Sequence, residues 1–438
     1  MKKLMIGNEA VAAGLHDGGL GVVSSYPGTP STEITEFLSK YDDIHSEWAP
    51  NEKVAAEVAF GASLAGARSA CAMKHVGLNV AADPLFTLSY TGVNGGMVLC
   101  VADDPAMHSS QNEQDSRHYA IASKVPMLEP SDSAEAYTFA KTAFELSERF
   151  DTPVILRMCT RIAHSQSIVE TGEKEPAVLK DYEKNPAKYI MMPGNAIKRH
   201  PFVEERTEKL REFAEDCIYN TVEMNGTDIG IITSGCSYLY VKEVFGDTAS
   251  ILKIGMPNPL PEKLIRKFAE SVKKLYVIEE LDPIIESYVK SLGIEVIGKE
   301  MFSPLGEFSQ HTIAAAFGKK LPETVSADSV IPARPPMMCA GCPHRGMFYT
   351  LAKNKITVMG DIGCYTLGAV PPLNALDSTL CMGASVSGLH GFNAARGEDS
   401  EAKSVAVIGD STFMHSGMTG LVNIAYHATN STVIILDN

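Results

Sequence analysis

Short, unbroken runs of apolar residues constrain the fold of this chain more than any other feature of its sequence. Residues 98–102 and 154–156 are two such runs, and residues 229–233, 405–408 and 433–436 repeat the pattern between helix-like segments. Strands that are apolar on both sides are typical of parallel sheets covered by helices on both faces. The sequence therefore predicts an α/β fold built of three doubly wound modules.

Changes in composition predict where these modules begin and end. Residues 1–170 form the first module, and residues 171–226, rich in lysine and glutamate with a charged helix expected at 204–215, form a linker with some helix. Residues 227–330 form the second module and residues 331–438 the third. Because the chain stops directly after an apolar strand, which would leave a sheet edge bare, we expect the third module to be truncated.

Helix signals in the first module are clear at three places. Asn8 is placed to cap a helix that Gly18 and Gly19 end, and a second helix begins near Ser31. An alanine-rich segment, residues 52–68, predicts a closely packed third helix that follows Asn51.

Composition excludes several classes of protein. The 438 residues are 45% hydrophobic and 21% charged, as in an ordinary globular protein. The balance of 53 acidic against 38 basic residues gives a net charge of −15, which argues against nucleic acid as a partner. The sequence shows neither an apolar stretch long enough to cross a membrane nor a signal peptide, so a cytoplasmic location with reduced thiols is expected.

The strongest chemical signal lies at two strand ends of the third module. Gly409, Asp410 and Ser411 follow one apolar strand, and Asn438 follows the next. In a parallel sheet these positions share one edge, and carboxylate and amide oxygens there suit Mg²⁺. The simpler explanation is a turn with an Asx cap. The spacing resembles the thiamine diphosphate motif, Gly-Asp-Gly followed later by Asn, with Ser411 in place of the commoner glycine.

A second signal is the segment of residues 51–61. It resembles the pyrimidine-binding helix of thiamine enzymes, in which a glutamate at the position of Glu52 contacts the aminopyrimidine ring and activates the cofactor. The simpler explanation is a glutamate that favours the positive end of the helix dipole. Glu57 is the competing candidate for the same role.

A third signal is the set Cys339, Cys342 and Cys364 with His344 nearby. The four side chains could bind zinc, or the three thiolates could bind an iron–sulfur cluster whose fourth ligand lies elsewhere. The same spacing is also compatible with a redox dithiol, and with a plain turn between two buried cysteines.

Weaker signals occur at two further strand ends. Thr29, in the loop of residues 26–31, could present its hydroxyl and backbone amides to a carboxylate, although a turn with a helix cap explains the loop equally well. His75 could contact substrate or be a buried histidine of the core.

Together these motifs resemble the 2-oxoacid:ferredoxin oxidoreductase family. The likeness covers the chain from residues 26–34 and 51–83, through 276–280 and 339–346, to 409–438. It implies pyrimidine-binding, transketolase C-terminal-like and diphosphate-binding domains. It also implies the reaction, oxidative decarboxylation of aryl 2-oxo acids such as indolepyruvate, with coenzyme A as the acyl acceptor. The implied cofactors are Mg²⁺ and thiamine diphosphate, and electrons would pass through [4Fe–4S] clusters to ferredoxin. A smaller beta subunit is the implied partner.

The resemblance also extends the predicted sites. It favours iron over zinc at the three cysteines, and it adds Gly363 and His344 to the residues expected to hold the cofactor. Relatives acting on pyruvate bind the substrate carboxylate with an arginine after the fourth strand, and residues 103–108 contain none. Arg117 and Thr29 are the candidates that remain for this contact.

Two further functions are compatible with the residues. The first is a thiamine diphosphate-dependent 2-oxo acid decarboxylase that does no redox chemistry. The second is a non-catalytic α/β subunit stabilised by zinc.

Overall fold

A sheet of six parallel strands organises the first part of the chain. The computed structural model describes residues 1–177, 179–320, 332 and 334–437. The chain separates into unit 1, residues 1–323, and unit 2, residues 324–438. In unit 1 the strand order is β3-β2-β4-β5-β7-β6, with β2 (Val22–Ser25), β3 (His45–Trp48), β4 (Ser69–Lys74), β5 (Met97–Asp103), β6 (Met127–Leu128) and β7 (Val154–Cys159).

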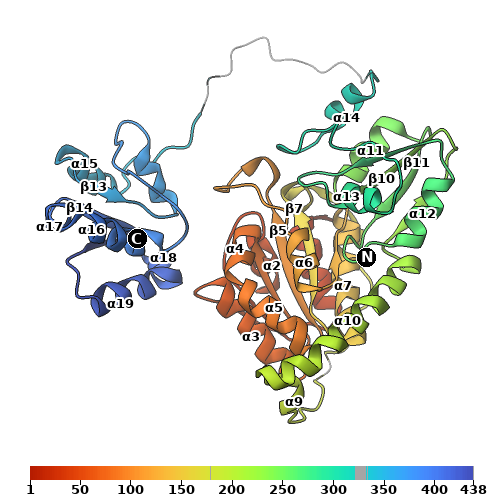
Figure 1. Ribbon diagram of the computed structural model, residues 1–438, viewed down its shortest axis with the longest axis horizontal. Helices are drawn as coiled ribbons and strands as arrows, with labels where there is room; N and C mark the ends of the chain where they lie inside the picture. Colours follow the sequence, from red (N-terminus) through yellow and green to blue (C-terminus); the bar gives the residue numbers. More distant parts are fainter. Residues whose placement is uncertain (178, 321–331, 333, 438) are drawn as a thin grey trace. The chain divides into compact units, whose positions relative to one another are not determined.

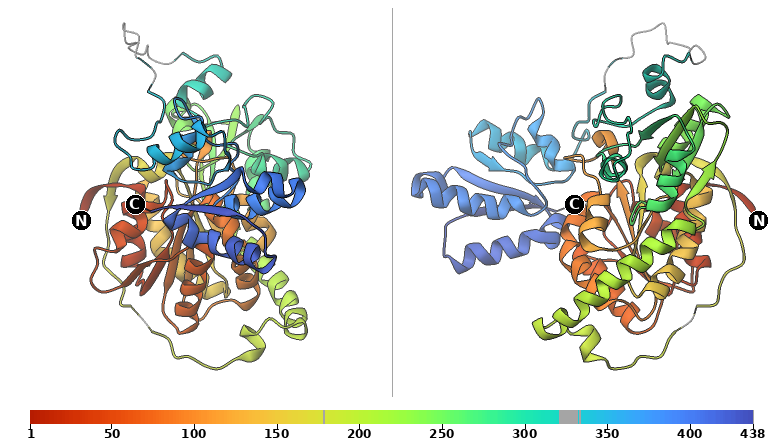
Figure 2. Two further views of the ribbon diagram at one scale, coloured as in Figure 1. Left: turned by 90° about the vertical axis from the view of Figure 1, so that its left-hand side faces the viewer. Right: turned by 45° about the vertical axis from the view of Figure 1, so that its right-hand side comes forward.

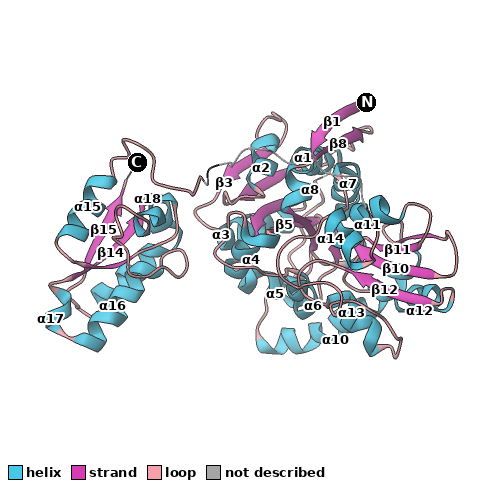
Figure 3. Cartoon of the chain, turned by 90° about the horizontal axis from the view of Figure 1, so that it is seen from above, coloured by secondary structure: helices cyan, strands magenta, loops and turns pink. Residues whose placement is uncertain are grey.

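Helices cover both faces of this sheet (Figure 1, Figure 3). One face packs against α1 (Gly7–Asp17), α2 (Thr32–Leu38) and α7 (Ser133–Phe150). The other face packs against α3 (Glu52–Leu64), α4 (His75–Val80), α5 (Ala82–Thr91) and α6 (Arg117–Ser123). Every residue of β5 is buried, as expected for a central strand of a parallel sheet.

The start of the chain differs from the prediction. β1 (Lys2–Ile6) pairs in antiparallel fashion with β8 (Gln166–Glu170), which follows the short helix α8 (Thr160–His164). Because β1 runs straight into α1, Ile6 takes the N-cap position and Asn8 lies inside the helix. The Asn8 amide is buried there and donates to the Pro30 carbonyl at 2.7 Å and to the Glu33 carboxylate at 2.8 Å. The prediction that Asn8 caps the helix is therefore wrong.

The charged segment that follows β8 is more ordered than the linker expected from its composition. It contains α9 (Pro186–Tyr189) and the 24-residue helix α10 (Pro193–Asp216), which is longer than the helix expected at residues 204–215. α10 packs against α5 on one side and against α12 (Glu262–Glu270) on the other (Figure 2). Its Arg206 is buried and donates to the carbonyls of Ser89 at 2.8 Å and Asp151 at 3.0 Å.

A second sheet completes unit 1. Its order is β12-β10-β11-β9, and β9 (Thr221–Glu223) is antiparallel to β11, whereas the other pairs are parallel. The remaining elements are β10 (Ile229–Ser234), β11 (Ser250–Ile254), β12 (Lys274–Ile278), α11 (Ser237–Phe245), α13 (Ile284–Ser291) and α14 (Gln310–Ala316). α12 buries Ile265 and Phe268 against this sheet, as its helical spacing predicts.

Unit 2 contains a three-stranded parallel sheet, in the order β13-β14-β15. Its elements are β13 (Thr357–Met359), β14 (Ser404–Gly409), β15 (Thr432–Leu436), α15 (Arg345–Lys353), α16 (Ala384–Arg396), α17 (Glu398–Glu401), α18 (Asp410–Thr412) and α19 (Met418–Tyr426). The α/β class with parallel sheets is confirmed. The finer module boundaries remain predictions. Among the described helices, none is both long and apolar enough to cross a membrane.

Candidate active site

The carboxyl ends of four strands in unit 1 bring one set of predicted residues to a common edge of the six-stranded sheet. Thr29 lies in the exposed loop after β2, Glu52 follows β3, His75 follows β4, and Asp104 follows β5. Ligands of doubly wound folds bind at this edge, which we call the first edge.

Glu52 is a buried acid of the first edge. Asn51 caps α3 by accepting the Val54 N–H at 2.9 Å, and this cap fixes Glu52 in the first turn, where it is 5% exposed. α4 approaches closely because residue 77 is glycine: a Cβ there would lie 2.5 Å from the Glu52 Oε1 atom. The sequence of α3 thus places a carboxyl group inside the fold, next to the start of α4.

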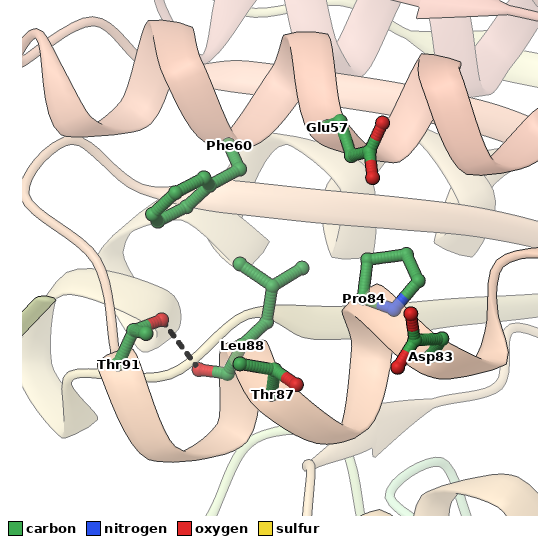
Figure 4. Close-up of a pocket in the computed structure, with 7 residues that line it drawn as sticks. All are labelled: Glu57, Phe60, Asp83, Pro84, Thr87, Leu88 and Thr91. Carbon is green, nitrogen blue, oxygen red and sulfur yellow. Dashed lines mark hydrogen bonds between the residues drawn. The ribbon is translucent and has the colours of Figure 1, made fainter. Parts of the chain in front are cut away.

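Glu57, the competing candidate, lies in a different environment. It is exposed and forms an ion pair with Lys53 on the same helix. Its side chain lines a pocket of about 310 Å³ between α3 and α5, opposite Asp83 and Pro84 (Figure 4). The structure therefore separates the two glutamates, and only Glu52 is buried at the first edge.

Lys74 provides a positive charge at this edge that the sequence interpretation did not single out. Its stem lies against Gly28, where a Cβ would be 3.2 Å from Cδ, and its Nζ donates to the Ser109 carbonyl at 3.0 Å. Burial lowers the pKa of Lys74, while the carboxylates of Asp104 and Glu52 favour its charged form. Lys74 therefore lies within electrostatic range of both acids.

Asp104 is held in its charged form by the loop that follows it. Its carboxylate accepts the Ser109 N–H at 2.9 Å, the Ser110 hydroxyl at 2.7 Å and the Thr160 hydroxyl at 2.8 Å. Burial raises the pKa of Asp104, but these hydrogen bonds outweigh burial and leave the pKa below its usual value.

His75 is fully buried and carries an unused acceptor. Its Nε2 lies 3.2 Å from the Asn112 carbonyl, which can only accept, so Nε2 carries the proton. In this tautomer Nδ1 is an acceptor, and among the described residues it has no hydrogen-bond partner. A buried, unpaired acceptor is costly unless a ligand supplies a donor.

Arg117 does not serve the role predicted for it. Its side chain is 1% exposed and pairs with Asp115 at 2.6 Å and Glu279 at 2.5 Å. It also donates to the carbonyls of Glu280 at 3.0 Å and Asp282 at 2.9 Å. The guanidinium therefore joins α6 to the loop after β12, and we remove Arg117 from the substrate-binding candidates.

A second buried arginine extends this ion-pair network. Arg157 pairs with Asp103 at 2.8 Å and with Glu129, and it lies 3.7 Å from Asp115. Burial raises the pKa of Asp115, but Arg117 and Arg157 outweigh it and hold that pKa well below its usual range. Both arginines of this network are therefore engaged by acidic groups of the chain itself.

Unit 2 carries the other predicted set, at the carboxyl ends of β13, β14 and β15, which we call the second edge. Gly409 ends β14 against the ring of Tyr365: a Cβ there would be 2.6 Å from Cε1, and one on Gly363 would be 2.4 Å from the same atom. Asp410 and Ser411 begin α18, and Thr412 donates to the Ile362 carbonyl at 3.1 Å.

Asp361 is a residue of the second edge that the sequence interpretation missed. It is fully buried, and its carboxylate accepts the N–H groups of Gly383 and Ser385, both at 2.9 Å, where α16 begins. It thereby ties the loop after β13 to that helix. Asn438, the second predicted Mg²⁺ ligand, lies outside the described residues.

The three cysteines of the predicted metal site lie in exposed turns of unit 2. Cys339 and Cys364 are exposed, Cys342 is partly buried, and His344 is buried at the start of α15. Among the described residues, the structure does not bring these ligand atoms to the mutual distances that one ion requires. The four-ligand zinc site is therefore not formed. A four-iron cluster spreads its cysteine ligands further apart than one zinc ion does, so the iron–sulfur prediction stays a prediction.

Comparison with known proteins identifies the class of enzyme. Residues 13–214 match the family described as pyruvate flavodoxin/ferredoxin oxidoreductase, thiamine diphosphate-binding. Residues 361–438 match the C-terminal binding domain of thiamine pyrophosphate enzymes. Both candidate edges lie within these matches. The fold and its sites therefore define an enzyme subunit of the thiamine diphosphate-dependent 2-oxoacid oxidoreductases.

Full-length relatives narrow this class to one family. The chain is 42% identical to indolepyruvate oxidoreductase subunit IorA of Archaeoglobus fulgidus and 39% identical to that of Pyrococcus horikoshii. The alignments cover all of this chain in both cases, and 75% and 74% of the respective relatives. The chain belongs to the family of indolepyruvate oxidoreductase subunit IorA.

A more distant structure shares the fold. The 2-oxoglutarate:ferredoxin oxidoreductase from Magnetococcus marinus, solved with 2-oxoglutarate, coenzyme A and succinyl-CoA bound, superposes with a TM-score of 0.62 at 18% identity. The superposition covers 72% of this chain and 65% of that one. The predicted fold class and family resemblance are both confirmed.

Proposed function

We propose that this chain is the thiamine diphosphate-binding subunit of an enzyme that oxidatively decarboxylates aryl 2-oxo acids such as indolepyruvate. Membership of the IorA family supports this reaction class. In the proposed reaction, coenzyme A takes the acyl group, and electrons pass through [4Fe–4S] clusters to ferredoxin. A smaller beta subunit completes the enzyme, in keeping with relatives that are named as subunits.

The residues at both edges fit thiamine diphosphate. The first edge offers a buried carboxyl group on Glu52 and the unpaired Nδ1 acceptor of His75, which suit a ligand carrying ring nitrogens and an amino group. The second edge offers Asp410 at the start of α18, next to Gly409, whose missing side chain lets the Tyr365 ring pack against the backbone there. The chemistry that thiamine diphosphate supplies when bound is a nucleophilic carbon and an electron sink.

Residues at both edges would have separate roles in binding the cofactor. Glu52 would hold a proton between its carboxyl group and the ring nitrogen, and its burial excludes water from that contact. His75 would orient the ligand through Nδ1. Asp410 and Asn438 would hold Mg²⁺, which prefers oxygen ligands, and Ser411, Gly363 and His344 would line the cofactor.

Substrate recognition requires a new assignment, since Arg117 is unavailable. Lys74 and Thr29 remain at the first edge, and Ser109 connects them: its carbonyl accepts from Lys74, and its hydroxyl donates to the Thr29 carbonyl at 3.3 Å. We assign the substrate carboxylate to this pair because Lys74 supplies the positive charge that the loop of residues 103–108 lacks.

The observation that carries the proposal is the buried, capped position of Glu52. In full-length protein loaded with Mg²⁺ and thiamine diphosphate, Glu52→Gln should slow exchange of the cofactor's C2 proton by about 10²-fold or more. NMR of quenched deuterium exchange measures this rate. Glu57→Gln is the matched control and should exchange normally. Near-normal exchange in Glu52→Gln, with full cofactor content, would contradict the proposal.

The iron–sulfur part needs a separate test. Cys342→Ser should lower iron and sulfide by about one cluster's worth without displacing thiamine, whereas Cys217→Ser, at a buried cysteine of unit 1, should leave both unchanged. Iron-free native protein prepared without oxygen would instead favour a decarboxylase that does no redox chemistry.

A further inference from the structure

A cluster of two thiols and one carboxylate lies in unit 1 and includes none of the predicted cofactor ligands. Cys159 ends β7, Cys236 precedes α11, and Glu280 follows β12, so three separate segments meet. The Cys159 and Cys236 sulfurs are 3.3 Å apart, and Cys236 Sγ is 3.1 Å from Glu280 Oε2. Among the described residues, this is the group whose ligand atoms lie close enough together to share one metal ion.

We propose that Cys159, Cys236 and Glu280 bind a thiophilic divalent cation of the zinc type, which links the six-stranded sheet to the second sheet of unit 1. Two sulfurs and one carboxylate oxygen are the ligand types that Zn²⁺ selects. Three protein ligands leave a fourth position for water. Cys236 also lines a pocket of about 130 Å³ with Arg161 and Tyr240, which gives an ion and its water a route to the ligands.

The distances favour a metal over a disulfide. With tetrahedral geometry and bonds of about 2.3 Å, two zinc-bound sulfurs lie roughly 3.8 Å apart. The observed separation of 3.3 Å therefore needs an outward shift of about half an ångström. A disulfide would need the sulfurs to approach by roughly 1.2 Å in a closely packed region.

The bound ion would balance most of the charge of its ligands. Two thiolates and a carboxylate bring three negative charges and Zn²⁺ removes two, and Arg161, which pairs with Glu307, lies within electrostatic range of Cys236. Zn²⁺ binds cysteine as the thiolate, so binding releases the protons of the two thiols.

Glu280 is already oriented for this role. Its other carboxylate oxygen accepts the Phe308 N–H at 2.7 Å, which fixes the plane of the carboxylate and leaves Oε2 directed toward Cys236. Such outer contacts commonly orient metal ligands.

The experiment measures zinc in the full-length chain, prepared without oxygen, stripped with chelator and then equilibrated with buffered Zn²⁺. Wild-type protein should retain about one zinc ion per chain more than Cys159→Ser or Cys236→Ser. Cys217→Ser is the matched control, because Cys217 is also buried in unit 1 but lies outside the cluster, and it should retain as much zinc as wild type.

X-ray absorption at the zinc edge then identifies the ligands. Two sulfur and two oxygen scatterers are expected in wild type, and Glu280→Gln should weaken zinc binding by about tenfold or more. The Glu280 variant keeps both thiols, so it tests the site even if the serine variants do not fold. Equal zinc in wild type and Glu280→Gln, an all-sulfur environment, or a Cys159–Cys236 disulfide in zinc-loaded protein would overturn the proposal.

Discussion

The two candidate edges are stabilised in different ways. The first edge, in unit 1, rests on buried ion pairs in which Arg117 and Arg157 contact four acidic residues, Asp103, Asp115, Glu129 and Glu279. The second edge, in unit 2, rests on a contact between glycines and the Tyr365 ring, and it leaves Cys339 and Cys364 exposed. Ion pairs within the chain therefore hold most of the first edge, where the His75 Nδ1 atom is an acceptor without a partner among the described residues, whereas the second edge presents exposed thiols.

The largest expected difference between the units is in cysteine reactivity. Each of the five cysteines of unit 1 is buried, and each of the four in unit 2 is at least partly exposed. Burial also raises the pKa of Cys100 to about 12, which removes the reactive thiolate. In metal-free native protein, iodoacetamide should modify the unit 2 cysteines faster by orders of magnitude, as mass spectrometry of tryptic peptides would show. Equal rates at Cys100 and Cys381 would abolish the contrast.

The next largest effect tests the buried ion pairs. Arg117→Met should lower the free energy of unfolding by about 3–5 kcal/mol, because it leaves the buried Glu279 carboxyl without its arginine and leaves Asp115 only the more distant Arg157 at 3.7 Å. Trp48, the one tryptophan of the chain, lies in unit 1 and reports its unfolding by fluorescence. Arg161→Met is the control: the Arg161 side chain is exposed and its partner Glu307 is partly exposed, so the loss should stay below about 1 kcal/mol. Similar losses of unfolding free energy in both variants would mean that burying an ion pair does not increase its contribution to stability.

A smaller effect is expected from the second edge. Gly409→Ala places a methyl group against the Tyr365 ring and should cost about 1–3 kcal/mol of stability in unit 2. Hydrogen exchange of the β14 amides measures this loss. Gly346→Ala, in exposed helix α15 with no heavy atom within 4 Å of the new Cβ, should instead gain up to about 1 kcal/mol. Unchanged protection in Gly409→Ala would show that the ring moves aside freely.

Local patterns predicted much of this structure because the causes are local. Apolar runs correctly placed β5, β7, β10, β14 and β15. The alanine-rich segment after Asn51 predicted a helix with Glu52 in its first turn, and the structure adds that Asn51 caps this helix. These features depend on residues within a few positions of one another.

The rest depends on residues that are far apart in the sequence. Nothing near Arg117 in the sequence shows that it pairs with Glu279, because Glu279 follows a strand of the second sheet. Cys159, Cys236 and Glu280 likewise carry no common motif, and only the meeting of β7 with the second sheet brings them together. The polar composition of residues 193–216 gave little sign of a packed helix, since Arg206 is buried through hydrogen bonds to carbonyls of other segments.

The position of α10 has a consequence for how this chain can be divided or recombined. α10 packs on α5 and on α12 at once, and Arg206 donates to carbonyls near the ends of α5 and α7. Removing either sheet with its helices would therefore expose one side of α10. A chimera that takes the second sheet from a relative should have its crossover point before residue 193, so that α10 comes from the same relative, and the α10 contacts with α5 should then be redesigned.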